Sequence, residues 1–143
     1  MPLDIVSRIM AARGGDSIVD IRNEWADSVE VAANKFGLAS SPGIYFEVSR
    51  QEAKAVLKAI LAEDMAYSCE LMPQLDAEKL ASAFVGEFID EAARYYTNGD
   101  FGKPREEPGV GPGWTPATDA TFDTGILVVT GTRIACAWFM DED

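Results

Sequence analysis

The segment TFDTGILVVTGTRIACAWFM, residues 121–140, decides the fold class of this chain. Two apolar runs, Ile126–Thr130 and Arg133–Phe139, flank the pair Gly131-Thr132, which is typical of a tight hairpin turn with glycine first. Both runs are apolar at nearly every position, whereas a half-exposed strand would alternate with polar residues. We therefore expect a β-hairpin that other parts of the chain cover on both faces.

Amphipathic helices are predicted upstream of the hairpin, because apolar residues recur there every three or four positions. The predicted helices cover residues 2–12, 16–36, 49–68 and 76–97. A short strand is predicted at residues 43–48, where apolar and polar side chains alternate. In the second helix the apolar positions are Ile18, Ile21, Trp25, Val29, Ala32 and Phe36.

These elements predict an α+β protein in which about four helices pack with a small, mostly antiparallel sheet that includes the C-terminal β-hairpin. The length of 143 residues fits a single domain, residues 1–143. Residues 98–120 hold four of the seven prolines and five of the twelve glycines, which predicts a long loop. Trp114 is the one large apolar residue near the end of this loop. We expect it either to anchor the loop in the core or to serve as a binding hot spot.

The amino-acid composition excludes several classes of catalytic site. The chain has no histidine, which removes Ser-His-Asp and Cys-His arrangements. Its two cysteines, Cys69 and Cys136, leave no zinc site of the usual ligand types and are expected to be buried free thiols. Carboxylate pairs such as Asp119 and Asp123 could still support acid–base chemistry or hold Mg²⁺, but their spacing matches no catalytic motif. We therefore expect no enzyme, no metal and no cofactor.

The net charge of −12, from 24 acidic and 12 basic residues, indicates the kind of partner. Direct binding to nucleic acid or to an anionic membrane is not expected, because both need clusters of lysine and arginine. The absence of a long apolar run or a signal-peptide pattern predicts a cytoplasmic protein. A basic protein is the partner that complements this charge.

Acidic residues recur at helical spacing along the predicted helix 16–36. The members of this acidic stripe are Asp16, Asp20, Glu24, Asp27 and Glu30. One interpretation pairs the stripe internally with basic residues of the next helix, namely Arg50, Lys54 and Lys58. A second is a merely solvated face. A third makes four of these acids the binding surface for a basic partner: Asp20, Glu24, Asp27 and Glu30.

The chain ends in three consecutive acids, Asp141, Glu142 and Asp143. Charges beside an apolar strand suppress unwanted strand pairing, so these acids could serve only as gatekeepers. They could also extend a surface that binds a basic partner. With Trp114, they are the secondary candidates for partner binding.

In size, in charge and in its lack of catalytic motifs, the chain resembles small acidic neutralising proteins: immunity proteins of bacterial toxins, antitoxins and phage-encoded inhibitors. The resemblance implies an inhibitor that binds a basic toxin or a nucleic-acid-handling effector and occludes its active site. An alternative is a non-catalytic subunit or adaptor of a larger assembly. A further alternative is a carboxylate-dependent, metal-assisted hydrolase.

Overall fold

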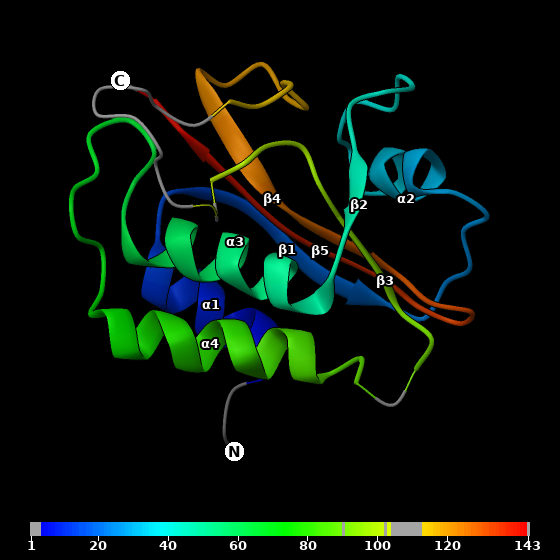
Figure 1. Ribbon diagram of the computed structural model, residues 1–143, viewed down its shortest axis with the longest axis horizontal. Helices are drawn as coiled ribbons and strands as arrows, with labels where there is room; N and C mark the ends of the chain where they lie inside the picture. Colours follow the sequence, from blue (N-terminus) through cyan, green and yellow to red (C-terminus); the bar gives the residue numbers. More distant parts are fainter. Residues whose placement is uncertain (1–3, 90, 102, 104–112, 143) are drawn as a thin grey trace.

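The computed structural model describes residues 4–89, 91–101, 103 and 113–142 (Figure 1). In chain order the elements are α1 (Ile5–Arg13), β1 (Asp16–Arg22), α2 (Val29–Lys35), β2 (Phe46–Val48), α3 (Arg50–Ala62), α4 (Gln74–Gly86), β3 (Arg94–Thr97), β4 (Phe122–Val129) and β5 (Ile134–Asp141). The strands form one antiparallel sheet in the order β1-β5-β4-β3-β2. The last hairpin therefore lies inside the sheet, with β1 and β2 at its edges.

The C-terminal hairpin is confirmed, and it is longer than expected. Pairing runs from Val129 opposite Ile134 to Phe122 opposite Asp141. The turn itself differs from the expected one, because Gly131 does not adopt a positive φ. Instead the hydroxyl of Thr130 closes the turn by accepting hydrogen bonds from the backbone N–H groups of Thr132 and Arg133, at 3.1 and 2.8 Å.

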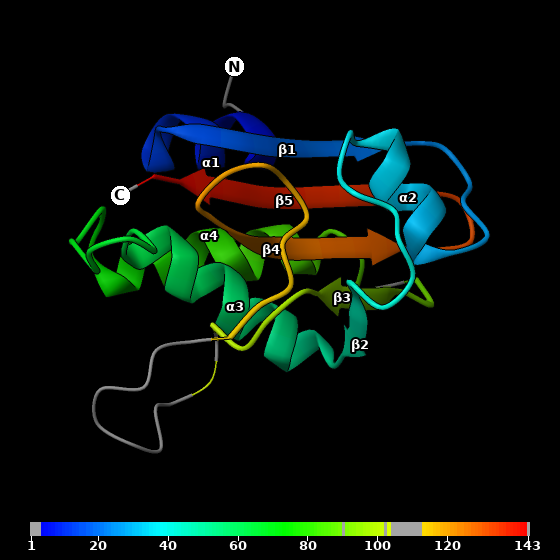
Figure 2. The same cartoon turned by 90° about the horizontal axis from the view of Figure 1, so that it is seen from above.

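Both faces of the hairpin are covered, as the continuously apolar strands predicted. Helices α1, α3 and α4 pack on one face of the sheet, and α2 with two loops covers the other (Figure 2). The core on the three-helix side includes Ile9, Leu57, Phe84, Ile126 and Phe139. The core on the α2 side includes Ala32, Phe36, Leu127, Cys136 and Trp138.

The expected small sheet is corrected by the structure. The class is α+β, but the sheet has five strands and makes up a large part of the described chain. Two segments that were expected to be helical, residues 16–22 and 94–97, are strands β1 and β3. These strands widen the sheet on both sides of the hairpin, so the helices pack on a broad surface.

The predicted helix 16–36 is wrong because its first part pairs with β5. Gly14 and Gly15 adopt φ values of 68° and 71°, which turn the chain from α1 directly into β1. Along β1, Val19 and Ile21 then face the three-helix core, and β-branched residues favour this extended conformation. Helix α2 begins much later, where the Ser28 hydroxyl caps it by accepting a hydrogen bond from the N–H of Val31 at 3.2 Å.

Two other predicted helices end early. Helix α3 ends at Ala62, not near Ser68, because Asp64 accepts backbone hydrogen bonds from Tyr67 and Cys69 and turns the chain. Helix α4 ends at Gly86, and β3 follows at residues 94–97. Tyrosine and threonine in this segment favour a strand once β4 offers hydrogen bonds.

A buried carboxylate fixes the loop after Trp114 to the sheet. Asp123 on β4 has no exposed surface. It accepts hydrogen bonds from the N–H of Ala117 at 3.0 Å, the indole N–H of Trp138 at 3.1 Å and the side-chain amide of Asn98 at 3.2 Å. The hydroxyl of Thr118 donates another at 3.1 Å. Of the predicted long loop 98–120, positions 102 and 104–112 lie outside the described residues.

Replacing Gly125 with alanine is expected to destabilise the protein. A Cβ there would lie 2.0 Å from the carbonyl oxygen of Ala137 and 2.7 Å from the Cα of Trp138. Backbone atoms must then shift, so we expect the free energy of unfolding to fall by about 1–3 kcal/mol or more. Gly86→Ala is the matched control, since nothing lies within 4 Å of its added Cβ. Equal urea midpoints for the two variants would contradict this packing.

The two thiols are expected to differ in reactivity. Both cysteines are free, but the prediction that both are buried is wrong, because Cys69 is exposed and only Cys136 is buried. Burial raises the pKa of the Cys136 thiol, so little reactive thiolate forms there. Ellman's reagent should modify one thiol in the native protein and two in denaturant. Rapid modification of both thiols in the native protein would contradict the assignment. So would a Cys136→Ala variant that no longer reacts in its native state, because Cys69 should still be modified.

Candidate protein-binding surface

The predicted acidic stripe is not a helix face. Asp20 lies in β1, Glu24 and Asp27 lie in the connection that follows, and Glu30 lies in the first turn of α2. Asp16 begins β1, at the far end of the strand from Glu24. The structure therefore distributes the stripe over a strand, a connection and the first turn of α2, and it places Glu24 beside Lys35 at the end of that helix.

Two of these acids are engaged in ion pairs with neighbouring cations. Asp20 accepts a hydrogen bond from Arg22 at 2.8 Å, and Glu24 pairs with Lys35 at 3.2 Å. The hydrogen bond that Arg22 donates to Asp20 is the main reason why the pKa of Arg22 is raised. The Arg22 guanidinium also lies 4.7 Å from the centre of the Phe36 ring. Asp20 and Glu24 are thus partly neutralised within the chain.

The interpretation that pairs the acidic stripe with the third helix is wrong for Lys54 and Lys58. Lys54 and Lys58 of α3 pair with Glu78 of α4, at 2.5 and 3.4 Å. The hydrogen bond from Lys54 is the main cause of the lowered pKa of Glu78. A charged seam between two helices does exist, but it joins α3 to α4 and leaves the acids near α2 unaffected.

Trp25 is the surface residue that sequence reasoning missed. It was expected on a buried helical stripe, but its side chain is 64% exposed in the β1–α2 connection. Asp27 lies two positions later, and Glu30 and the exposed Val31 lie in the first turn of α2. We call these four residues the Trp25 surface. Neither acid forms a salt bridge with any residue that the structure describes. The Ser28 cap was the sequence signal that Trp25 precedes the helix.

Two of the C-terminal acids, Asp141 and Glu142, are bonded to other parts of the fold. Arg13 donates two hydrogen bonds to Asp141, at 2.7 and 3.1 Å, and both side chains are largely buried. Met65 donates its backbone N–H to the same carboxylate at 2.9 Å. Glu142 accepts hydrogen bonds from the hydroxyl and the backbone N–H of Thr121. Asp143 lies outside the described residues.

Trp114 acts as an anchor within an aromatic cluster. Its ring lies 5.4 Å from both Phe101 and Phe122, measured between ring centroids. Its indole N–H is buried and has no hydrogen-bond partner in the described structure. The backbone of Trp114 also bridges to Gly99. This packing matches the first of the two interpretations that the sequence left open.

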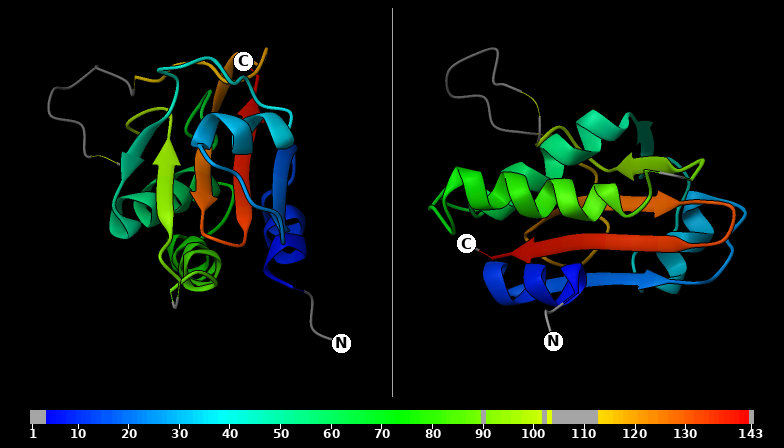
Figure 3. Two further views of the ribbon diagram at one scale, coloured as in Figure 1. Left: turned by 90° about the vertical axis from the view of Figure 1, so that its right-hand side faces the viewer. Right: turned by 90° about the horizontal axis from the view of Figure 1, so that it is seen from below.

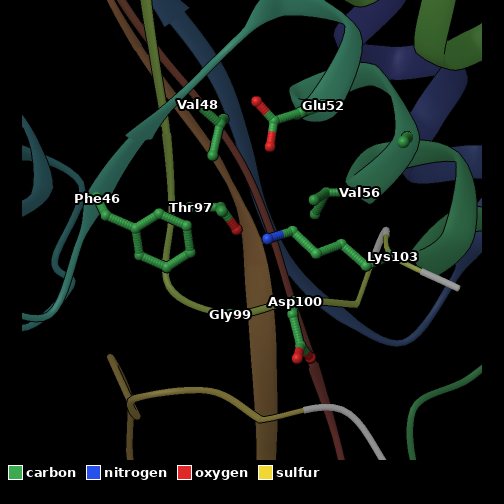
Figure 4. Close-up of a pocket in the computed structure, with 9 residues that line it drawn as sticks. Phe46, Val48, Glu52, Val56, Thr97, Gly99, Asp100 and Lys103 are labelled. Carbon is green, nitrogen blue, oxygen red and sulfur yellow. The ribbon is translucent and has the colours of Figure 1, made fainter. Parts of the chain in front are cut away.

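A small cavity lies between β2, the start of α3 and the segment after β3 (Figure 4). Its volume is about 60 Å³. Phe46 forms one wall, and the side chain of Lys103 extends across it toward Thr97 (Figure 4). The pKa of Glu52 is lowered mainly by the backbone N–H of Ser49, with a smaller effect from the charge of Lys103. The volume suits a few waters, whereas ligand pockets typically measure about 300–1,000 Å³.

Breaking the buried Arg13–Asp141 pair is expected to destabilise the fold strongly. Arg13→Met leaves the Asp141 carboxylate without its cation, and Asp141→Asn does the reverse. Each should lower the free energy of unfolding by about 3–5 kcal/mol in urea titrations.

The matched control for this pair is Lys35→Met, which breaks the exposed pair with Glu24. This variant should lower the free energy of unfolding by at most about 1 kcal/mol. If the free energy of unfolding fell by the same small amount in all three variants, the buried pair would not be a main stabilising contact.

Comparisons with known proteins found no match, so a functional assignment rests on the geometry of the structure. Neither a protein-family model, nor a curated protein, nor a solved structure matches the chain. Among the described residues, no three acidic or cysteine side chains are grouped so that they could hold a metal ion. No helix in the same part of the chain has the length and apolar character to cross a membrane.

Proposed function

We propose that the protein is an inhibitor that binds a basic protein, as an immunity protein or antitoxin that occludes the active site of a toxin or effector. The proposal is carried by the Trp25 surface, in which an exposed tryptophan is closely followed in the chain by Asp27 and Glu30. Asp27 and Glu30 thereby replace Asp20 and Glu24 as the leading acids.

The chemistry of this surface suits a protein partner. Tryptophan is enriched among the residues that contribute most to binding, because a large apolar ring can be fully desolvated at an interface. An exposed tryptophan has no such contact in the unbound chain. Burying it against a partner removes about 150–250 Å² of aromatic surface from water. The ring can also face an arginine or lysine of the partner in a cation–π contact.

The acids beside Trp25 supply specificity for a basic partner. Complementary charge accelerates association and excludes acidic competitors. Because neither carboxylate is buried, we expect both to act mainly on the association rate, and salt should screen them over about 8 Å at physiological ionic strength. A subunit or adaptor would instead bind through its apolar side chains, and salt would leave that binding nearly unchanged.

The proposal is tested with immobilised protein exposed to lysate of the source organism, followed by affinity measurements with the purified captured protein. Trp25→Ala should weaken binding at least about 30-fold, as expected for a hot-spot residue. The double variant Asp27→Asn, Glu30→Gln should slow association and reduce the salt dependence. The urea midpoints of these variants should stay unchanged, since Trp25 and Asp27 are exposed and Glu30 is only partly buried in the first turn of α2.

Tyr67→Ala is the matched control, because Tyr67 is 65% exposed and lies in another part of the chain. It should leave affinity unchanged. Expression of the captured protein alone should slow growth, and co-expression with this chain should restore it. A partner that binds Trp25→Ala as tightly as the wild type, or one whose expression does not affect growth, would contradict the proposed function.

A further inference from the structure

A second surface feature is a groove lined by residues of α1, of α4 and of the segment before α4. Helices α1 and α4 lie on the three-helix side of the sheet (Figure 3). Its volume is about 470 Å³, within the range of about 300–1,000 Å³ that is usual for ligand sites. The residues that line it are Arg8, Ala11, Ala12, Met72, Asp76, Lys79 and Leu80. It is far larger than the cavity beside Lys103.

The floor of the groove is apolar. Met72 and Leu80 belong to the three-helix core and are 8% and 7% exposed, so they present a firmly packed surface. Ala11 and Ala12 line the α1 side, and their short side chains leave room between the helices. An apolar chain lying on this floor would be removed from water, which is favourable by about 25 cal/mol per Å² of apolar surface.

The rim of the groove carries two cations, Arg8 from α1 and Lys79 from α4. Neither forms an ion pair with a residue in the described ranges. Other basic residues do form ion pairs with carboxylates: Arg13, Arg22, Lys35, Lys54, Lys58 and Arg133. In a chain with twice as many acids as bases, two cations outside these ion pairs line one groove, together with one acid, Asp76.

We propose that this groove binds a small amphiphile, an apolar chain that ends in a carboxylate. The chain would lie on Met72 and Leu80, and the head group would lie between Arg8 and Lys79. Charge complementarity selects an anion over a neutral or cationic head group. Asp76 also lines the groove, and its negative charge opposes the anion. The site lies on α1 and α4, so it is independent of the Trp25 surface and of the proposed function.

Decanoate is the probe, with binding measured by calorimetry and by displacement of 1-anilinonaphthalene-8-sulfonate. Arg8→Gln and Lys79→Gln should each weaken decanoate binding about threefold, as expected for loss of one exposed charge pair. Asp76→Asn should strengthen it by a similar factor, because a repulsive charge is removed. Arg94→Gln is the control, since it removes an exposed cation on β3, away from the groove.

The neutral analogue decanol separates recognition of the anion from simple apolar binding. It should bind more weakly than decanoate and respond to none of the charge variants. Near-ultraviolet circular dichroism and urea midpoints confirm that each variant is folded. The proposal is overturned if decanoate does not bind, if decanol binds as tightly, or if the rim variants behave like Arg94→Gln.

Discussion

The buried carboxylate of Asp123 is the constraint on which the α2 side of the molecule depends. A carboxylate removed from water is stable only when hydrogen bonds replace its hydration, and here the donors come from three separate segments. Asn98 follows β3, Ala117 belongs to the loop before β4, and Trp138 lies on β5. Gly125 completes the arrangement, because only a residue without Cβ allows its strand to approach Ala137 and Trp138 so closely. One side chain therefore joins a loop, a strand end and a core tryptophan.

Arg13 and Asp141 serve the same purpose on the opposite face. Their pair joins α1 to β5, and the guanidinium also donates to the carbonyl of Ile60 on α3 at 2.8 Å. Several acids of this chain thus stabilise the fold. Fewer carboxylates are therefore available to a partner than the net charge suggests. Those beside Trp25 have no such internal partner in the described structure, which is why a binding role rests on them.

The features predicted well from the sequence depend on neighbours in the chain. The capping box of Ser49 and Glu52 is present at the start of α3, and the C-terminal hairpin forms where its turn was expected. The segment 16–22 was mispredicted because its helical spacing of apolar residues is satisfied equally by a strand once β5 is available. The acids that it carries were consequently assigned to one face, and Trp25 to a buried stripe, although that residue lies between two elements.

The sequence by itself determined the acidic charge, the absence of histidine, the hairpin and the helix-capping signals, because each is a property of composition or of residues close in the chain. The tertiary structure alone decided which carboxylates are buried and which remain on the surface. Arg13 and Asp141 are 128 positions apart, and no local pattern marks them as partners. The exposure of Trp25 likewise follows from the pairing of β1 with β5, since that pairing ends the strand before the tryptophan and delays α2 until Ser28.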